Sequence, residues 1–203
     1  MYLSDEKILE NWKLFVNFSQ KMGDKRKDKI KIFLDENEER LSLTPASTRK
    51  AYHAAYPGGL VDHSLRVLKI AKNLTEAVGL YNGLNAESII FSCLFHDIGK
   101  LGEGGKNGLD YYIPESSTWH RDNLGQYYKI NDKLNYMKNS LRGIYLLQQY
   151  GIPLTEDEFL AIYLNDGWIE EQNKPYCLKE PALVTLVQQA DYLATKEEKK
   201  FKY

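Results

Sequence analysis

Two ionisable residues, His96 and Asp97, follow one another in the segment LFHDIGK, residues 94–100. They end an apolar run, IIFSCLF, at residues 89–95. Burying an aspartate without a partner costs several kcal/mol. Either hydrogen bonds from the protein satisfy the pair, or a positive charge sits beside it.

Two more ionisable residues fall on apolar helical stripes. His63 lies four residues before Val67, and Asp191 lies four residues after Val187. Three predicted helices would each aim such a side chain at a buried face. Two imidazoles and two carboxylates that converge in a core form a ligand set for a divalent metal. Spacing alone leaves open the alternative that these are core residues satisfied by protein hydrogen bonds.

Helical spacing of apolar residues along most of the chain predicts a mostly helical protein. Ser4 and Asn85 are expected N-caps, and Thr155 with Glu158 is expected to form a capping box. We expect the charged stretch KMGDKRKDK to be solvated. We expect the C-terminal segment KEEKKFKY to be frayed. The predicted helices cover residues 8–16, 30–41, 60–78, 85–98, 136–150, 155–166 and 181 onward, with a glycine-rich loop at 99–108 and little regular structure at 111–131.

The composition favours a globular, cytoplasmic protein. The chain has 203 residues, a formal net charge of −1 and two cysteines. Two cysteines are too few for a fold held together by disulfides. The near-neutral net charge gives no general attraction to nucleic acid or to an anionic membrane. The start, MYLSDEKILE, is polar, and no apolar stretch approaches the roughly 18 residues of a membrane span.

The four residues, in order, resemble the HD-domain superfamily of metal-dependent phosphohydrolases. The segments PGGLVDHSLRV, LFHDIGK and QQADYLAT carry the resemblance, which covers about residues 45–197. Upstream, PASTRKAYHAAYPGGL is similar to a subgroup with YhaM-type 3′–5′ exoribonucleases and relaxase-associated HD domains. The resemblance implies an all-α bundle around a buried metal site, as an HD domain at 45–203 with an N-terminal helical extension at 1–44 packed on it.

The resemblance also implies roles for single residues. The metal ligands would be His63, His96, Asp97 and Asp191, and they are compatible with Mn, Mg, Fe, Co, Ni or Zn. Asn139 and Asn165 depart from members that hold two metals, where histidines are expected. Asparagine replaces an imidazole poorly, so one tightly held metal is predicted. The expected catalytic groups are Asp97, Lys100 and Arg142, and the expected substrate-binding groups are His53, Lys106, Asn139, Asn165 and Asp166.

Three functions fit this pattern. The first is hydrolysis of a phosphoester of a nucleotide or small metabolite by a metal-activated water. The second is a phosphodiesterase or 3′–5′ exonuclease acting on single-stranded nucleic acid or cyclic nucleotides. The third is a weakly active regulatory domain that binds a metal or nucleotide. The oligomeric state is left open by the sequence.

Overall fold

The computed structural model describes residues 3–200 and confirms the all-α prediction. Eight α-helices and one small antiparallel sheet are formed within this range. The helices are α1 (Asp5–Ser19), α2 (Asp24–Leu43), α3 (Gly59–Ala77), α4 (Ala86–Phe95), α5 (Thr118–Leu124), α6 (Asn139–Gln149), α7 (Glu156–Tyr163) and α8 (Ala182–Lys200). The strands are β1 (Tyr112–Pro114) and β2 (Tyr128–Ile130), and short 3-10 turns lie at Gly79–Tyr81, Ile98–Leu101, Gly167–Ile169 and Glu171–Tyr176.

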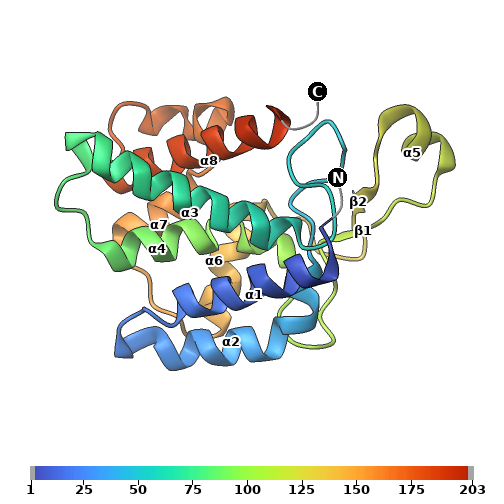
Figure 1. Cartoon of the computed structure of the whole chain (residues 1–203), viewed down its shortest axis with the longest axis horizontal. Helices are drawn as coiled ribbons and strands as arrows, with labels where there is room; N and C mark the ends of the chain where they lie inside the picture. Colours follow the sequence, from blue (N-terminus) through green and yellow to red (C-terminus); the bar gives the residue numbers. More distant parts are fainter. Residues whose placement is uncertain (1–2, 201–203) are drawn as a thin grey trace.

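Helix α3 runs through the centre of the bundle. It packs against α4 and α8, and also against α1 and α2. Figure 1 shows α1 and α2 side by side along one side of the bundle, with α8 along the opposite side. The β1–β2 hairpin and α5 project at one end. This layout brings α3, α4 and α8 into mutual contact; α3 and α8 carry predicted ligands, and two more follow the end of α4.

The capping motifs predicted at the starts of three helices are confirmed. The Ser4 side chain accepts a hydrogen bond from the Lys7 N–H, and Asn85 accepts one from the Glu87 N–H at 2.8 Å. Thr155 and Glu158 form the expected capping box at the start of α7. Because each cap satisfies backbone donors that the helix itself leaves free, these short motifs fix where the helices begin.

Three local expectations were wrong. Residues 111–131 contain β1, α5 and β2, because Tyr112 and Pro114 pair with Ile130 and Tyr128 across the intervening helix. Helix α2 starts at Asp24, six residues before the predicted start at residue 30 and inside the charged stretch expected to be solvated. Helix α8 extends to Lys200, whereas the segment from residue 196 was expected to fray. The last three residues of that segment, 201–203, lie outside the described residues.

The N-terminal helices are fixed to the rest of the bundle by aromatic and ionic contacts. Phe15 of α1 and Phe33 of α2 both make edge contacts with Phe95 of α4, with ring centroids 5.8 and 6.2 Å apart. Arg26 of α2 forms two hydrogen bonds, at 2.8 and 2.9 Å, with Glu158 of α7. The boundary at residues 44 and 45 stays a prediction.

Within residues 3–200 no helix combines the length and the apolar character needed to cross a membrane.

Candidate metal centre

Two imidazoles and two carboxylates meet where α3, α4 and α8 pack together. His63 lies in α3, His96 and Asp97 follow α4, and Asp191 lies in α8. His63 Nε2 is 2.9 Å from Asp191 Oδ1, and His96 Nε2 is 3.4 Å from Asp97 Oδ2. The other nitrogen–oxygen pairings, His63 with Asp97 and His96 with Asp191, are 3.9 Å apart. The structure thus brings together the four residues predicted as ligands.

Hydrogen bonds behind the rings fix the orientation of both histidines. His63 Nδ1 is 3.0 Å from Glu198 Oε1, and His96 Nδ1 is 2.9 Å from the backbone carbonyl of Cys93. A carboxylate and a carbonyl can only accept, so each Nδ1 carries a proton that it donates. In the neutral rings, each Nε2 lone pair therefore points toward Asp97 and Asp191.

This donor set fits a divalent cation. His63 and His96 are fully buried, and their Nε2 atoms make no well-aligned hydrogen bond with any described residue. Nitrogen lone pairs that face carboxylate oxygens repel one another unless a cation lies between them. Imidazole nitrogen together with carboxylate oxygen suits Zn, Fe, Mn, Co and Ni.

Without a metal, a proton provides part of the missing positive charge. Burial opposes protonation of His63, but contacts with Asp191 and Glu198 raise the pKa of its imidazole to about 10. Burial likewise opposes ionisation of Asp97, but the charge of Lys100 and the two imidazoles outweigh it and hold the pKa of this carboxyl well below its usual range. For Asp191, contact with His63 lowers the pKa in the same way, against the effect of burial.

These shifts predict that metal affinity rises with pH. Below about pH 10 the metal must displace the His63 proton, so acid favours the metal-free form. We expect the apparent dissociation constant to fall about tenfold per pH unit between about pH 6.5 and about pH 8.5. Competition with a chelator of known proton affinity measures this slope. A dissociation constant that is the same at both ends of the range would contradict the assignment.

Comparison with known protein families identifies the family to which these four residues belong. The family model of the HD domain matches residues 60–196, which is 137 of the 203 residues and includes all four predicted ligands. The chain belongs to the HD-domain family. HD domains are in general metal-dependent phosphohydrolases that bind divalent metals. Neither the search of curated proteins nor the search of solved structures gave a match.

Three donors surround Asp97 of this HD domain. Lys100 Nζ is 2.5 Å from Asp97 Oδ2, which is the oxygen facing the imidazoles. Asn139 Nδ2 and Asn165 Nδ2 lie 2.6 and 3.3 Å from Asp97 Oδ1. The two asparagines therefore direct their amide nitrogens at the carboxylate. The expected role of Asn139 and Asn165 in binding substrate stays a prediction.

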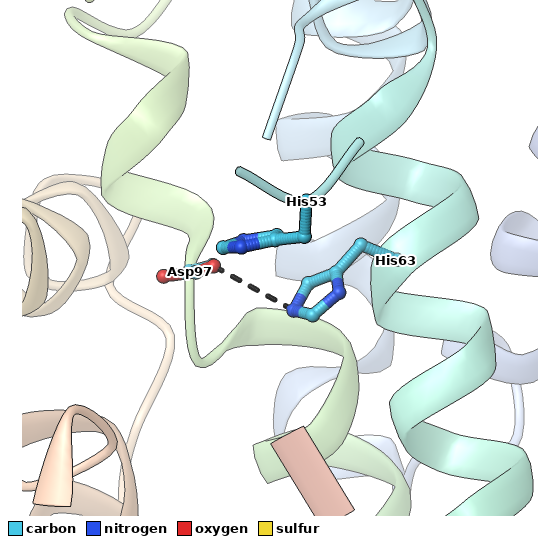
Figure 2. Close-up of side chains that lie close together, drawn as sticks. All are labelled: His53, His63 and Asp97. Carbon is cyan, nitrogen blue, oxygen red and sulfur yellow. Dashed lines mark ion pairs between the residues drawn. The ribbon is translucent and has the colours of Figure 1, made fainter. Parts of the chain in front are cut away.

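His53 lies over the candidate metal site, and Figure 2 shows it beside His63 and Asp97. Its ring centroid is 4.6 Å from that of His63, and one ligand atom from each of His53, His63 and Asp97 falls within 4.8 Å of the others. Burial and the nearby positive charge of His63 keep the pKa of His53 well below its usual value. A neutral imidazole with an unbonded Nε2 therefore faces the site.

Two cavities lie next to the candidate metal site. One, of about 900 Å³, is lined by Asp166 and Asp191 and by the aromatic side chains of Trp168 and Tyr192, among others. The other, of about 310 Å³, includes Lys100 among its lining residues. Although Asp166 is exposed as a residue, withdrawal of its carboxyl group from bulk water and the charge of Asp97 raise its pKa to about 6.

Lys106 and Arg142 are the two remaining residues that were predicted for the site. Lys106 is exposed and lines the smaller cavity. Arg142 is buried, donates to the carbonyl of Asn135 at 2.5 Å and lies over the ring of Tyr111. The glycine-rich loop is held from α2, where Arg40 binds the carbonyls of Glu103 and Gly105 at 2.8 and 2.9 Å. The catalytic role of Arg142 and the substrate role of Lys106 stay predictions.

Proposed function

We propose that this HD domain is a hydrolase of a phosphoester of a nucleotide or small metabolite, with one divalent metal held by His63, His96, Asp97 and Asp191. The observation that carries the proposal is the convergence of two oriented, buried Nε2 lone pairs and two carboxylates, one of them the partly exposed Asp191. A metal bound there would supply Lewis-acid activation of water and of the phosphoryl group.

The surroundings of Asp97 favour one metal over two. Its Oδ1 oxygen, directed away from the imidazoles, already accepts from the amides of Asn139 and Asn165. The ammonium group of Lys100 occupies a further position beside Oδ2. A second cation bound by Asp97 would have to displace these donors, and amide N–H groups cannot coordinate it.

Three groups near the ligands are assigned to the substrate. Lys100 is positioned to neutralise charge that builds on the non-bridging phosphoryl oxygens. Its pKa is raised, because the charge of Asp97 outweighs the effect of burial, so it stays an ammonium. His53 is neutral and can bond to a phosphoryl oxygen or to the attacking water through its ring nitrogens. Asp166, which lines the larger cavity, is the third group that we assign to substrate binding.

Replacing Lys100 by alanine is expected to lower kcat/KM by about 10²-fold. The ammonium is lost from the place where negative charge develops, and Asp97 loses its closest cationic partner. Lys72→Ala is the matched control, because the Lys72 side chain is 74% exposed on the outer face of α3. Steady-state hydrolysis by both variants measures the effect. An activity of Lys100→Ala that equals that of Lys72→Ala would exclude the role.

The larger cavity favours a nucleotide as the substrate. Trp168 and Tyr192 are 48% and 56% exposed, so each presents ring surface to which a base can stack. Gln188 and Gln189 add amide groups suited to the polar edge of a base. No Lys or Arg occurs among the described residues that line this cavity, which disfavours a long run of additional phosphates there.

The smaller cavity supports the second candidate, a phosphodiesterase acting on single-stranded nucleic acid. Its lining combines Lys100 and Lys106 with Tyr112 and Tyr128. Basic groups interleaved with aromatic rings are the usual means of holding a single strand. A strand entering here would place its phosphate at Lys100 and hence next to the metal ligands.

A substrate panel separates these candidates. Metal-stripped protein is reloaded with Mn, Mg, Co, Ni or Zn and tested on nucleoside mono- and triphosphates, cyclic nucleotides, a generic phosphodiester and a labelled single strand. We expect a nucleoside monophosphate or similar small phosphoester to be hydrolysed best. Preferred cleavage of the strand, with affinity that falls steeply as salt rises, would select the second candidate. Metal binding without any hydrolysis would select the regulatory alternative.

A further inference from the structure

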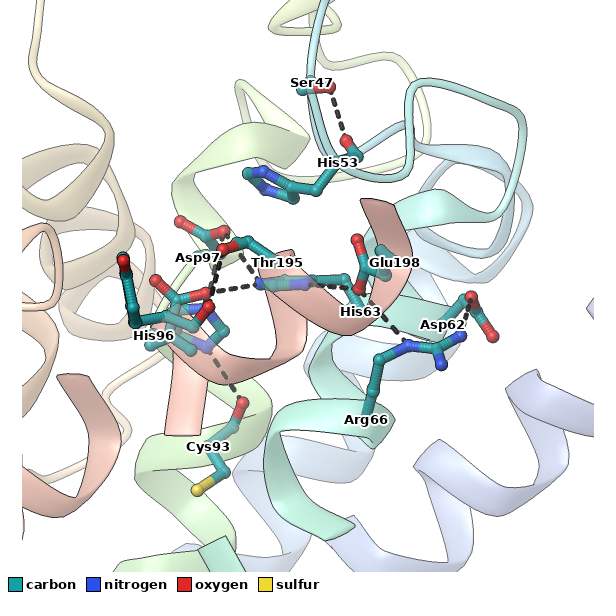
Figure 3. A network of polar contacts seen from close by, with 12 residues as sticks. Ser47, His53, Asp62, His63, Arg66, Cys93, His96, Asp97, Thr195 and Glu198 are labelled. Atoms are coloured by element: carbon teal, nitrogen blue, oxygen red, sulfur yellow. Dashed lines mark hydrogen bonds and ion pairs between the residues drawn. The ribbon is translucent and has the colours of Figure 1, made fainter. Parts of the chain in front are cut away.

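A carboxylate stands behind His63, on the side away from the other ligands. Glu198 Oε1 is 3.0 Å from His63 Nδ1, and the Glu198 side chain is 3% exposed. Figure 3 shows Glu198 reaching this ring from α8, the helix that also carries Asp191. Seven residues separate the two acids, which is about two helical turns, so both lie on the same face of α8. Glu198 falls outside the matched family segment, residues 60–196.

Glu198 is itself held in place. Arg66 Nε lies 3.3 Å from Glu198 Oε1, and Arg66 Nη2 lies 3.3 Å from Asp62 Oδ2. Asp62 in turn accepts hydrogen bonds from the Tyr56 hydroxyl at 2.8 Å and from Asn11 Nδ2 at 2.9 Å. A continuous polar chain thus leads from α1, through Asp62, Arg66 and Glu198, to the ring of a metal ligand.

The two ligand histidines differ in what orients them. The Nδ1 proton of His96 is accepted by the backbone carbonyl of Cys93, which every residue type would provide. The Nδ1 proton of His63 is accepted by a side chain, so its orientation depends on the residue at position 198. A carboxylate accepts hydrogen bonds only, and thus it keeps the proton on Nδ1 and the lone pair on Nε2.

We propose that Glu198 is a positioning residue for the metal centre. It fixes the tautomer and the orientation of His63, and Arg66 with Asp62 fixes Glu198 in turn. Through this chain the N-terminal helix α1 and the loop that carries Tyr56 support the metal site, although neither supplies a ligand. The inference rests on the proposed metal site and adds a residue that acts through His63.

Metal affinity tests this role without any substrate. Zn²⁺ alone is titrated into metal-stripped wild-type protein, Glu198→Ala, Glu198→Gln and Glu197→Ala, against a chromophoric chelator. Loss of an orienting carboxylate behind a ligand histidine typically weakens metal binding by about 10- to 100-fold. We expect that loss for Glu198→Ala. Glu198→Gln should lose less, because its amide oxygen still accepts from Nδ1. Glu197 is exposed and adjacent, so Glu197→Ala should match wild type.

A spectroscopic readout separates orientation from a general weakening of the end of α8. The chain has four histidines, so ¹⁵N-histidine labelling of the zinc-loaded protein gives a spectrum that can be assigned. The protonated Nδ1 of His63 should be seen in wild type and in Glu198→Gln, and should exchange rapidly or disappear in Glu198→Ala.

The outcomes distinguish this inference from the proposed function. If His96→Ala loses zinc while Glu198→Ala binds it within about twofold of wild type, the metal site stands and the role of Glu198 is refuted. Equal losses in Glu197→Ala and Glu198→Ala would also refute it. If His96→Ala binds zinc as wild type does, the metal site itself is refuted.

Discussion

Replacing His96 by alanine is expected to abolish specific metal binding and to lower phosphoester hydrolysis by about 10³-fold or more. The ring supplies a buried Nε2 nitrogen, 3.4 Å from Asp97 Oδ2 and 3.9 Å from Asp191 Oδ1, so its loss would take one of the two imidazoles from the proposed ligand set. A bound metal contributes several kcal/mol of transition-state stabilisation, and each ~1.4 kcal/mol is a factor of ten in rate. Metal content after dialysis and steady-state hydrolysis measure the two effects.

Two further variants make this result interpretable. Asp97→Asn preserves the shape of the side chain and removes its charge, so it should lose metal and activity without a loss of helix content. His120→Ala is the matched histidine control, because His120 is 44% exposed on α5, where it faces Glu115. Retained metal and activity in His96→Ala, or an equal loss in His120→Ala, would contradict the assigned ligand set.

Replacing Arg26 by methionine is expected to lower the free energy of unfolding by about 3–5 kcal/mol. Glu158 is fully buried, and Arg26 is the cation that binds both of its oxygens. Removing the guanidinium leaves a carboxylate without its counter-charge inside the bundle, which is the costly way to break a buried ion pair. Urea unfolding followed by circular dichroism measures the loss.

The matched control and a pH series sharpen this prediction. Lys31→Met removes an i,i+4 pair with Asp35 in which both side chains are 61% exposed, so it should cost less than about 1 kcal/mol. Burial opposes ionisation of Glu158, but Arg26 lowers its pKa below the ordinary 4.5. A carboxyl group whose pKa is lower in the folded protein than in the unfolded chain stabilises the fold at any pH above its unfolded-state pKa. This stabilisation is lost as the pH falls through the pKa of the folded protein. The gap between wild type and Arg26→Met should therefore narrow in acid, and equal effects of the two variants would contradict the prediction.

The helices were predictable where the signal is local. Ser4, Asn85 and the pair Thr155–Glu158 each act within one helical turn, and each caps the helix that it was expected to cap. The β1–β2 hairpin was missed because its strands are three residues long and pair across an intervening helix. Such pairing depends on contacts distant in the sequence, which apolar periodicity does not report.

The sequence predicted which four candidate ligands lie together, and it predicted less of what surrounds them. Periodicity placed His63, His96 and Asp191 on apolar faces of three helices, with Asp97 next to His96, and the resemblance implied the same four residues as ligands. Glu198 was missed because it lies in a segment whose charge suggested a frayed end. Its position seven residues after Asp191 was the available signal. The direction of the Asn139 and Asn165 amides toward Asp97 depends on tertiary packing, and no spacing in the sequence encodes it.

A titration of activity against added metal tests most directly whether one ion held by His63, His96, Asp97 and Asp191 drives hydrolysis. Metal-stripped protein at a concentration well above the dissociation constant receives Mn²⁺ in steps, and hydrolysis of the best substrate of the panel is measured at each step. Activity is expected to rise linearly and to reach its plateau at one equivalent. Activity that appears only after a second equivalent, or that never appears although metal binds, would contradict a single catalytic metal.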